Sequence, residues 1–171
     1  IILTLNVYDS LVSLDDDIVS AHKYAKENKY PNFIANGDEI VPHNYMNFDF
    51  EKRLDFLTKF YGTWYIQFYL TWKRMAHAVN DGICWITYEN AILNKKNLET
   101  NISNFLNLNK SEISNIGHIF DDPKSVFTRF NKGISGRGNK ITNESKTFLK
   151  DYARFFSEFD KFDFFNLFGD Q

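Results

Sequence analysis

Residues 51–79 read EKRLDFLTKFYGTWYIQFYLTWKRMAHAV and form the longest periodic stretch of the chain. Apolar residues recur in it at steps of three and four, the spacing that places side chains on one face of an α-helix. The positions on this stripe are Leu54, Leu57, Phe60, Tyr61, Trp64, Tyr65, Phe68, Trp72, Met75, Ala76 and Val79. We interpret the stripe as the core-facing side of one long amphipathic helix; the alternative is an exposed platform for stacking. Asn80-Asp81-Gly82 then marks the end of that helix.

Two short apolar runs, residues 1–6 and 83–88, lie outside this helix and are typical of buried strands. Further helices are expected from Asp9 or Ser10 to about Ala25, over residues 90–108, and from Thr142 or Asn143 to about Phe159. Strands that alternate with helices through long connections predict an α/β fold, with a central parallel sheet flanked by helices. Because two strands do not form a stable sheet alone, we expect the rest of the sheet upstream of Ile1 or in another chain.

The composition limits the class of protein. A length of 171 residues suits one domain, and 18 Phe, 9 Tyr and 3 Trp supply enough apolar surface for a core. A single cysteine, Cys84, excludes an intrachain disulfide, and its place inside the second run favours an inert buried thiol. A net charge of −2 argues against a nucleic-acid partner. With no apolar run near the ~18–20 residues of a membrane span, and no signal peptide in residues 1–5, we expect a cytoplasmic protein.

Several polar features have an ordinary structural interpretation. Asp15, Asp16 and Asp17 lie in the early turns of the first helix, where we expect solvated carboxylates that complement the helix dipole rather than a metal site. The four histidines share no metal-ligand spacing with one another or with Cys84, so no metal is expected. Residues 26–50 lack a sustained period and predict a long loop, a kind of segment that is often functional.

The strongest local candidate for chemistry is the glycine-rich basic loop of residues 131–140, NKGISGRGNK. Its three glycines let the backbone approach a ligand and expose N–H groups, while Lys132, Arg137 and Lys140 add positive charge. These residues suit a cradle for an anion or a phosphate; a flexible basic surface loop is the alternative. The nucleoside triphosphate loop pattern G-x-x-x-x-G-K-[ST] is not present in the sequence.

Two further candidate sites follow the predicted strands, because ligands of open α/β sheets bind beyond the carboxyl ends of the strands. Asp9 and Ser13 come after the first strand, and the Ser13 hydroxyl can donate a hydrogen bond to a phosphate oxygen. Simple capping of the first helix is the alternative there. Tyr88 ends the second strand and could contact a base or a sugar.

Taken in this order, the sites resemble those of sulfotransferases that use 3′-phosphoadenosine-5′-phosphosulfate (PAPS). Residues 2–13 resemble the segment of form R-x-P-x-D-x-x-V-S that holds the donor's 3′-phosphate, through Asp9, Val12 and Ser13. Residues 64–72 resemble a long helix of bacterial members. Residues 85–89 and 104–106 resemble the family's Y-E-D strand end and F-L-G helix. Residues 130–138 resemble the loop of form F-R-K-G-x-x-G that closes over the same 3′-phosphate.

The resemblance covers most of residues 1–160 and implies the P-loop-kinase-like sulfotransferase fold, truncated at the N-terminus. It implies transfer of a sulfuryl group from PAPS to a hydroxyl or amine of a small-molecule or glycan acceptor, and leaves homo-oligomerisation open. It names no catalytic base. The residues that it places at the donor are Ser13, Tyr88, Lys132, Gly133, Gly136, Arg137 and Gly138.

The chain also departs from the family pattern. Leu5 stands where the family has Arg, Val7 where it has Pro, and Asn131 where it has a second Arg, a charge that we expect Arg137 to replace. The family's P-K-S-G-T phosphosulfate loop is not in the sequence, so we expect it upstream of Ile1. Two alternatives stay open: a non-catalytic nucleotide-binding module, and a helical interaction protein whose aromatic stripe docks a partner.

Overall fold

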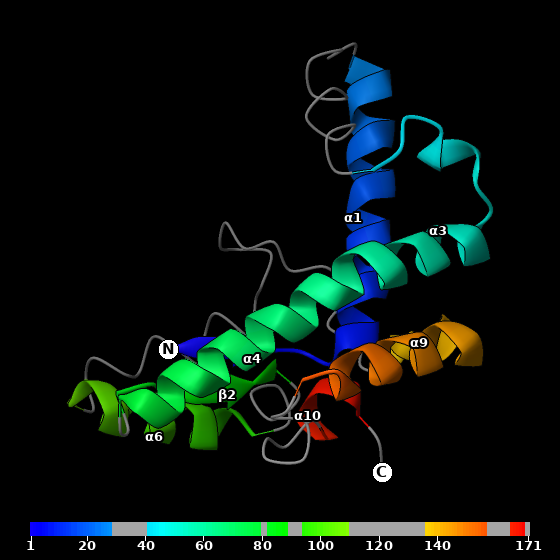
Figure 1. Cartoon of the computed structure of the whole chain (residues 1–171). Coiled ribbons are helices and arrows are strands. Elements are labelled where there is room, and N and C mark those ends of the chain that lie inside the picture. Colours follow the sequence, from blue (N-terminus) through cyan, green and yellow to red (C-terminus); the bar gives the residue numbers. More distant parts are fainter. Residues whose placement is uncertain (29–40, 80–81, 89–93, 110–135, 157–164, 170–171) are drawn as a thin grey trace.

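The computed structural model describes residues 1–28, 41–79, 82–88, 94–109, 136–156 and 165–169, and most of these residues are helical (Figure 1). The α-helices are α1 (Val7–Asn28), α3 (Phe50–Leu57), α4 (Thr63–Ala78), α6 (Lys95–Leu106), α9 (Asn143–Arg154) and α10 (Phe165–Phe168). The 3-10 turns are η1 (Tyr45–Asn47) and η3 (Arg137–Lys140), and η2 (Thr58–Gly62) is a π-helical turn between α3 and α4. The strands are β1 (Ile2–Thr4) and β2 (Trp85–Thr87).

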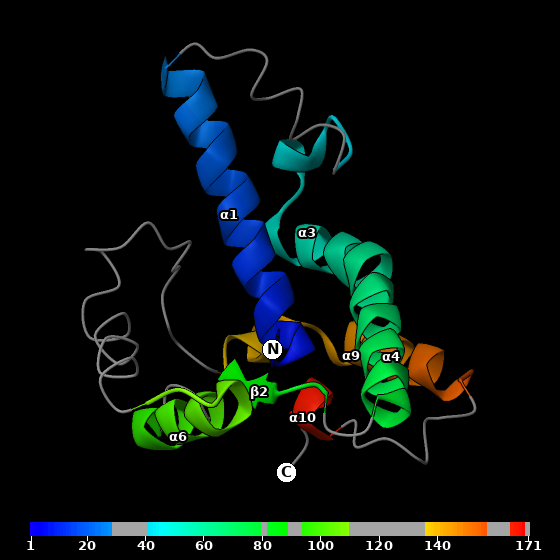
Figure 2. The same cartoon turned by 90° about the vertical axis from the view of Figure 1, so that its left-hand side faces the viewer.

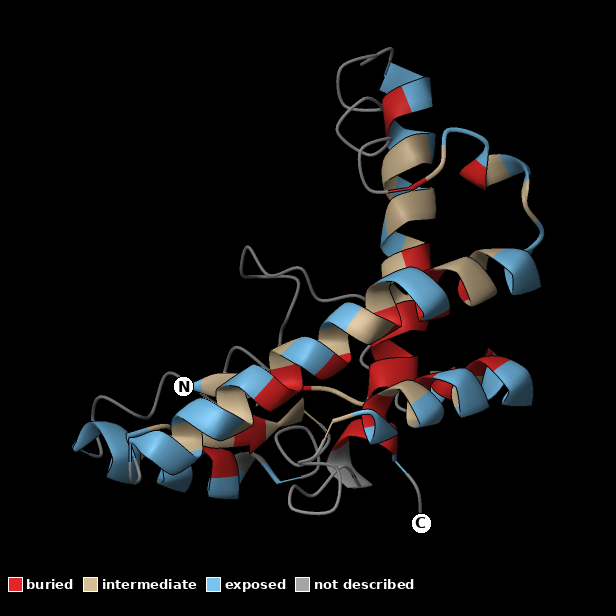
Figure 3. Ribbon diagram, in the orientation of Figure 1, coloured by how far each residue is buried: buried red, intermediate tan, exposed pale blue. Residues whose placement is uncertain are grey.

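The helices are arranged around the N-terminal half of α1. Helix α3 and the π-turn η2 cross α1, and α9 lies against η2 and α4 (Figure 1). The view in Figure 2 places β2 and α6 on one side of the base of α1, and α4 and α9 on the other. Buried residues gather where these helices meet, as Figure 3 shows. The buried core residues are Val7, Tyr8, Leu11, Val12, Val41, Tyr45, Leu54, Leu57, Ile66, Tyr69, Leu70, Ile141, Leu149, Ala153, Leu167 and Phe168.

The predicted α/β fold with a central parallel sheet flanked by helices is wrong. Both expected strands form and pair in parallel, with Thr4 opposite Thr87, but each has only three residues and together they are the whole sheet of the described chain. The first strand ends at Thr4, before the end of the apolar run of residues 1–6, and α1 begins at Val7, directly after that run. The large core cluster is made by helices packing on helices and not by helices covering a sheet.

Helix α1 begins at a cap that the sequence interpretation missed. The side-chain Oδ1 of Asn6 accepts hydrogen bonds from the backbone N–H groups of Tyr8 (2.9 Å) and Asp9 (3.2 Å), which satisfies two of the free donors at a helix start. Capping was predicted for Asp9 or Ser10, three or four residues later. Because Asn6 takes that role, the Asp9 carboxylate is available for a contact elsewhere.

The helix predicted for residues 51–79 is confirmed in position, but its buried face matches the predicted one only in part. The π-turn η2 contains one more residue per turn than an α-helix does. The side chains of α4 are therefore rotated about the helix axis relative to those of α3. Before η2 the predicted positions Leu54 and Leu57 are buried, whereas after it the buried residues are Ile66, Tyr69 and Leu70. The predicted core positions that are instead exposed are Phe60, Trp64, Met75 and Val79.

The C-terminal elements close the helical core. In α9, Leu149 lies so close to Gly62 of the π-turn that a Cβ at residue 62 would come within 2.7 Å of the Leu149 side chain. The glycine therefore lets α9 approach η2. Helix α10 packs on the core, because Leu167 and Phe168 are buried and the Phe168 ring lies 5.8 Å from that of Tyr8.

Candidate functional site

Two sequence-predicted site segments are in direct contact. The Asp9 carboxylate, in the first turn of α1, accepts a hydrogen bond from the Gly136 N–H at 2.8 Å and one from the Gly138 N–H at 2.5 Å. The partners are 127 and 129 residues apart in the sequence. Asp9 is only 6% exposed. A buried carboxylate that accepts two backbone hydrogen bonds makes a strong contact, so residues 136–138 of the glycine-rich loop are held at the start of α1.

Two glycines of this loop, Gly136 and Gly138, are needed for the contact with α1. A Cβ at Gly138 would lie 2.3 Å from the Cβ of Tyr8 and 3.1 Å from the backbone nitrogen of Asp9, so only glycine fits. Gly136 has a φ of +81°, in the left-handed region that glycine adopts without strain. The prediction that this loop presents its N–H groups to a ligand therefore needs adjustment, because the amides of Gly136 and Gly138 already donate to Asp9.

Arg137 makes the second tie between the loop and α1. Its Nη2 lies 2.5 Å from an Asp16 carboxylate oxygen, in an ion pair whose side chains are 9% and 26% exposed. Asp16 was predicted to be one of three solvated acids, and this long-range partner explains the difference. The guanidinium that the sequence assigned to a ligand phosphate is thus held in this structure by a carboxylate of the chain itself.

Ser13 lies between these two ties. It follows Asp9 by four residues and precedes Asp16 by three, and residues at these spacings share one face of a helix. Both acids on this face contact the segment of residues 136–138, so Ser13 belongs to the face of α1 that the loop covers. The Ser13 side chain is half-buried.

The remaining predicted residues are placed as follows. Tyr88 directly follows β2, and because Thr87 pairs with Thr4, it lies at the end of the strand pair from which the chain enters α1. It is half-buried. Lys132 and Gly133 lie outside the described residues. The structure therefore brings together Ser13 and residues 136–138, with Tyr88 at the adjacent strand end.

Comparisons with protein-family models, curated proteins and solved structures give no match.

The donor atoms on this face of α1 suit a phosphate group. Ser13 can donate through its hydroxyl and Arg137 through a planar guanidinium that matches two oxygens of one phosphate. The Gly136 and Gly138 amides hold the loop that carries Arg137 and are engaged in doing so. The described part of the chain holds no group of three or more His, Cys, Asp or Glu side chains that could bind a metal ion. None of its helices has the length and apolar character required to cross a membrane.

A buried ionic cluster around Asp15, the residue directly before Asp16 in α1, was not predicted from the sequence. Arg53 donates to the Asp15 carboxylate through Nε (2.8 Å) and Nη2 (3.2 Å), and the Tyr45 hydroxyl donates to the same carboxylate at 2.7 Å. Asp15 is 1% exposed, so the prediction that it is solvated is wrong. Burial, with the Asp15 contact, raises the pKa of Tyr45 far above its usual value, and the hydrogen bond to Asp15 raises the pKa of Arg53. No local sequence pattern predicts this cluster, because Arg53 lies 38 residues from Asp15.

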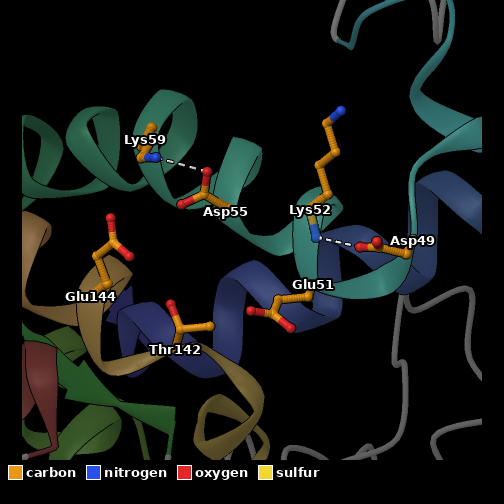
Figure 4. Close-up of a pocket in the computed structure, with 7 residues that line it drawn as sticks. All are labelled: Asp49, Glu51, Lys52, Asp55, Lys59, Thr142 and Glu144. Carbon is orange, nitrogen blue, oxygen red and sulfur yellow. Dashed lines mark hydrogen bonds and ion pairs between the residues drawn. The ribbon is translucent and has the colours of Figure 1, made fainter.

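A polar pocket of about 520 Å³ opens between the starts of α3 and α9 (Figure 4). Its lining residues are Asp49, Glu51, Lys52, Asp55, Lys59, Thr142 and Glu144. Several of these have structural tasks. Asp49 and Thr142 cap α3 and α9 through the backbone N–H groups of Lys52 and Ser145, and Asp55 pairs with Lys59 at 2.8 Å. The pocket is therefore accounted for by the capped starts of α3 and α9 that line it, and we assign it no binding or catalytic role.

Proposed function

We propose that the chain binds the 3′-phosphate of PAPS and serves sulfuryl transfer to a hydroxyl or amine of an acceptor. One observation carries the proposal. The two segments that resemble the 3′-phosphate-binding elements of sulfotransferases, around Asp9 and around Gly136, are fastened to each other although 127 residues separate them. Ser13 lies on the same face of α1, which supports its role as a phosphate ligand.

In such a reaction the bond between the donor's phosphate oxygen and sulfur breaks, and a bond from sulfur to the acceptor's oxygen or nitrogen forms. The acceptor loses a proton to a base, and adenosine 3′,5′-bisphosphate leaves. The residues proposed here act on the part of the donor that does not react. By binding the 3′-phosphate, these residues orient the nucleotide. Binding energy from this part of the donor, away from the reacting sulfur, can lower the barrier of the chemical step. We assign no base.

Calorimetry with adenosine 3′,5′-bisphosphate tests the binding part of this proposal, with adenosine 5′-monophosphate as the ligand control. The bisphosphate should bind more tightly, because only it carries the 3′-phosphate. Ser13→Ala and Lys132→Ala should each weaken binding by about 1.5–3 kcal/mol, the range for hydrogen bonds to charged groups. Lys26→Ala, an exposed residue at the far end of α1, is the matched control and should bind as the wild type does.

Two outcomes would contradict the proposal. The first is the absence of any binding heat at millimolar bisphosphate. The second is equal affinity for the two nucleotides, since the 3′-phosphate would then make no contact. Transfer of radiolabelled sulfuryl from PAPS to acceptors separates an enzyme from a non-catalytic nucleotide-binding module.

A protein-interaction role is the second candidate, and one observation favours it. Phe60 in η2 is 66% exposed, Trp64 in α4 is 54% exposed, and Met75 and Val79, near the end of α4, are exposed as well. Exposed apolar side chains in a continuous stripe often mark a surface that meets another protein. Substitution of Trp64 by Glu should abolish self-association or partner binding if that role is correct, with sedimentation velocity as the measurement, and should leave nucleotide binding unchanged.

A further inference from the structure

The ion pair between Arg137 and Asp16 bears directly on how an anion would bind. The pair is short, at 2.5 Å between Nη2 and the carboxylate oxygen. Arg137 is 9% exposed, whereas Asp16 is 26% exposed and therefore the more accessible of the two side chains. The Arg137 guanidinium is already paired with the Asp16 carboxylate, so a phosphate must displace Asp16 to contact Arg137.

The loop does not depend on this pair alone for its position. Asp9 holds the loop separately, through the backbone amides on both sides of Arg137. Gly138, which has no Cβ, also packs closely against Tyr8 at the start of α1. The contact between Arg137 and Asp16 can therefore open while residues 136–138 stay fastened to α1.

We propose that Asp16 occupies Arg137 in an ion pair that a dianionic phosphate displaces, so that Asp16 sets how strongly an anion must bind to reach this guanidinium. This inference rests on the proposed function, in which Arg137 contacts the donor's 3′-phosphate. A phosphate monoester carries about −1.5 to −2 charges near neutral pH and has three acceptor oxygens, so it competes well with a single carboxylate. A monoanionic group has no such advantage. Displacing Asp16 lowers the affinity of every anion at Arg137 by the same factor, so a phosphodiester or a carboxylate, which binds a guanidinium more weakly than a terminal phosphate does, keeps too little affinity to occupy it.

The position of Ser13 suits this exchange. It lies between Asp9 and Asp16 on the loop-covered face of α1, three residues before Asp16. A phosphate that replaces the Asp16 carboxylate at Arg137 would come within reach of a second donor from the same helix face. The carboxylate, which is part-exposed, can turn towards solvent when it is displaced.

The test compares Asp16→Asn with Asp17→Asn. Both variants remove one negative charge from the same turn of α1, but Asp17 is exposed. The probes are adenosine 3′,5′-bisphosphate and its 3′-phosphate methyl ester, a monoanion at that position. We expect Asp16→Asn to bind both probes about tenfold more tightly than the wild type, with the bisphosphate the tighter ligand of either protein. Asp17→Asn should change both affinities little.

A double variant makes the assignment specific to the pair. When Arg137→Gln is present, Asp16→Asn should no longer increase affinity, because no guanidinium is left to release. Equal gains in Asp16→Asn and Asp17→Asn would overturn the proposal, since the effect would then be general electrostatics. Weaker binding by Asp16→Asn, with a lower melting temperature, would also overturn it and make the pair purely structural.

Inorganic phosphate as a second probe separates this inference from the proposed function. If neither nucleotide binds to any variant, but phosphate raises the melting temperature of Asp16→Asn more than that of Asp17→Asn, the PAPS proposal fails and the role of Asp16 stands. If phosphate has no such differential effect either, both fail. If the wild type binds the bisphosphate and Asp16→Asn gains nothing, only the role of Asp16 fails.

Discussion

Replacement of Arg53 by Met should strongly destabilise the protein. Arg53 makes two hydrogen bonds to the Asp15 carboxylate and donates a third, through Nη1, to the Phe48 carbonyl at 3.0 Å. The Asp15 side chain is 2% exposed, so water cannot take the place of the lost guanidinium. In the variant the carboxylate keeps the Tyr45 hydroxyl as a partner but loses its counter-ion.

The size of the effect follows from that burial. Breaking a buried ion pair by removing one partner costs about 3–5 kcal/mol, because a charge stays buried without compensation. Domains of this length lose about 2–4 °C of melting temperature per kcal/mol, so a fall of roughly 6–20 °C is expected. Whole domains are stable by only about 5–15 kcal/mol, so this one change removes a large fraction of the total.

Urea unfolding followed by circular dichroism measures the loss. Arg154→Met is the matched control, because Arg154 pairs with Asp151 on the surface, with side chains 61% and 56% exposed, and such pairs contribute about 0–1 kcal/mol. Adding Asp15→Asn to Arg53→Met should restore part of the stability, since both charges are then gone. If Arg53→Met unfolds within about 1 kcal/mol of the wild type, the reasoning about this cluster is wrong.

Three further predictions concern single side chains. Gly138→Ala should lower the free energy of unfolding by about 1–3 kcal/mol, because the new Cβ would overlap Tyr8; unchanged stability in urea would contradict the close approach. Tyr45→Phe should reduce the loss of stability that the wild type shows above pH ~10. The raised pKa of Tyr45 keeps its phenol neutral in the folded state, whereas the phenol of the unfolded chain ionises, so the free energy of unfolding of the wild type falls as the pH rises. Parallel pH profiles of the two proteins in urea unfolding would refute this. Thr58→Val should raise the free energy of unfolding by about 1 kcal/mol, and with it the melting temperature, because the buried Thr58 hydroxyl has no hydrogen-bond partner among the described residues. A lower melting temperature would show that the hydroxyl does have a partner.

The long helix shows what periodicity could and could not predict. Apolar spacing located the helix over residues 51–79, and Leu54 and Leu57 are buried as expected. Beyond the π-turn the same rule selected Trp64, which is 54% exposed, and left out Ile66, which is fully buried. Periodicity assumes a constant number of residues per turn, and the π-turn breaks that assumption at one place. An aromatic-rich sequence hides the shift, because almost any face of this helix is apolar.

The candidate site shows a similar division between local and long-range information. Glycine spacing marked Gly136 and Gly138 as special, and both prove to need glycine. Their partner could not be derived from local rules, since Asp9 was interpreted as a helix cap and Asn6 performs that task. The acids after it were assigned to solvent because the dipole rule considers one helix by itself. Asp16 instead meets a residue 121 positions away.

The π-turn also governs how this chain can tolerate changes of length. Removing one residue from η2 would restore an ordinary α-helical repeat and turn α4 by about 100° relative to α3. Ile66 and Leu70 would leave the core, and bulky aromatic side chains would be driven against α9, where Gly62 and Leu149 allow little room. Single-residue insertions and deletions between Phe50 and Ala78 therefore act on the whole helix, far from the point of change.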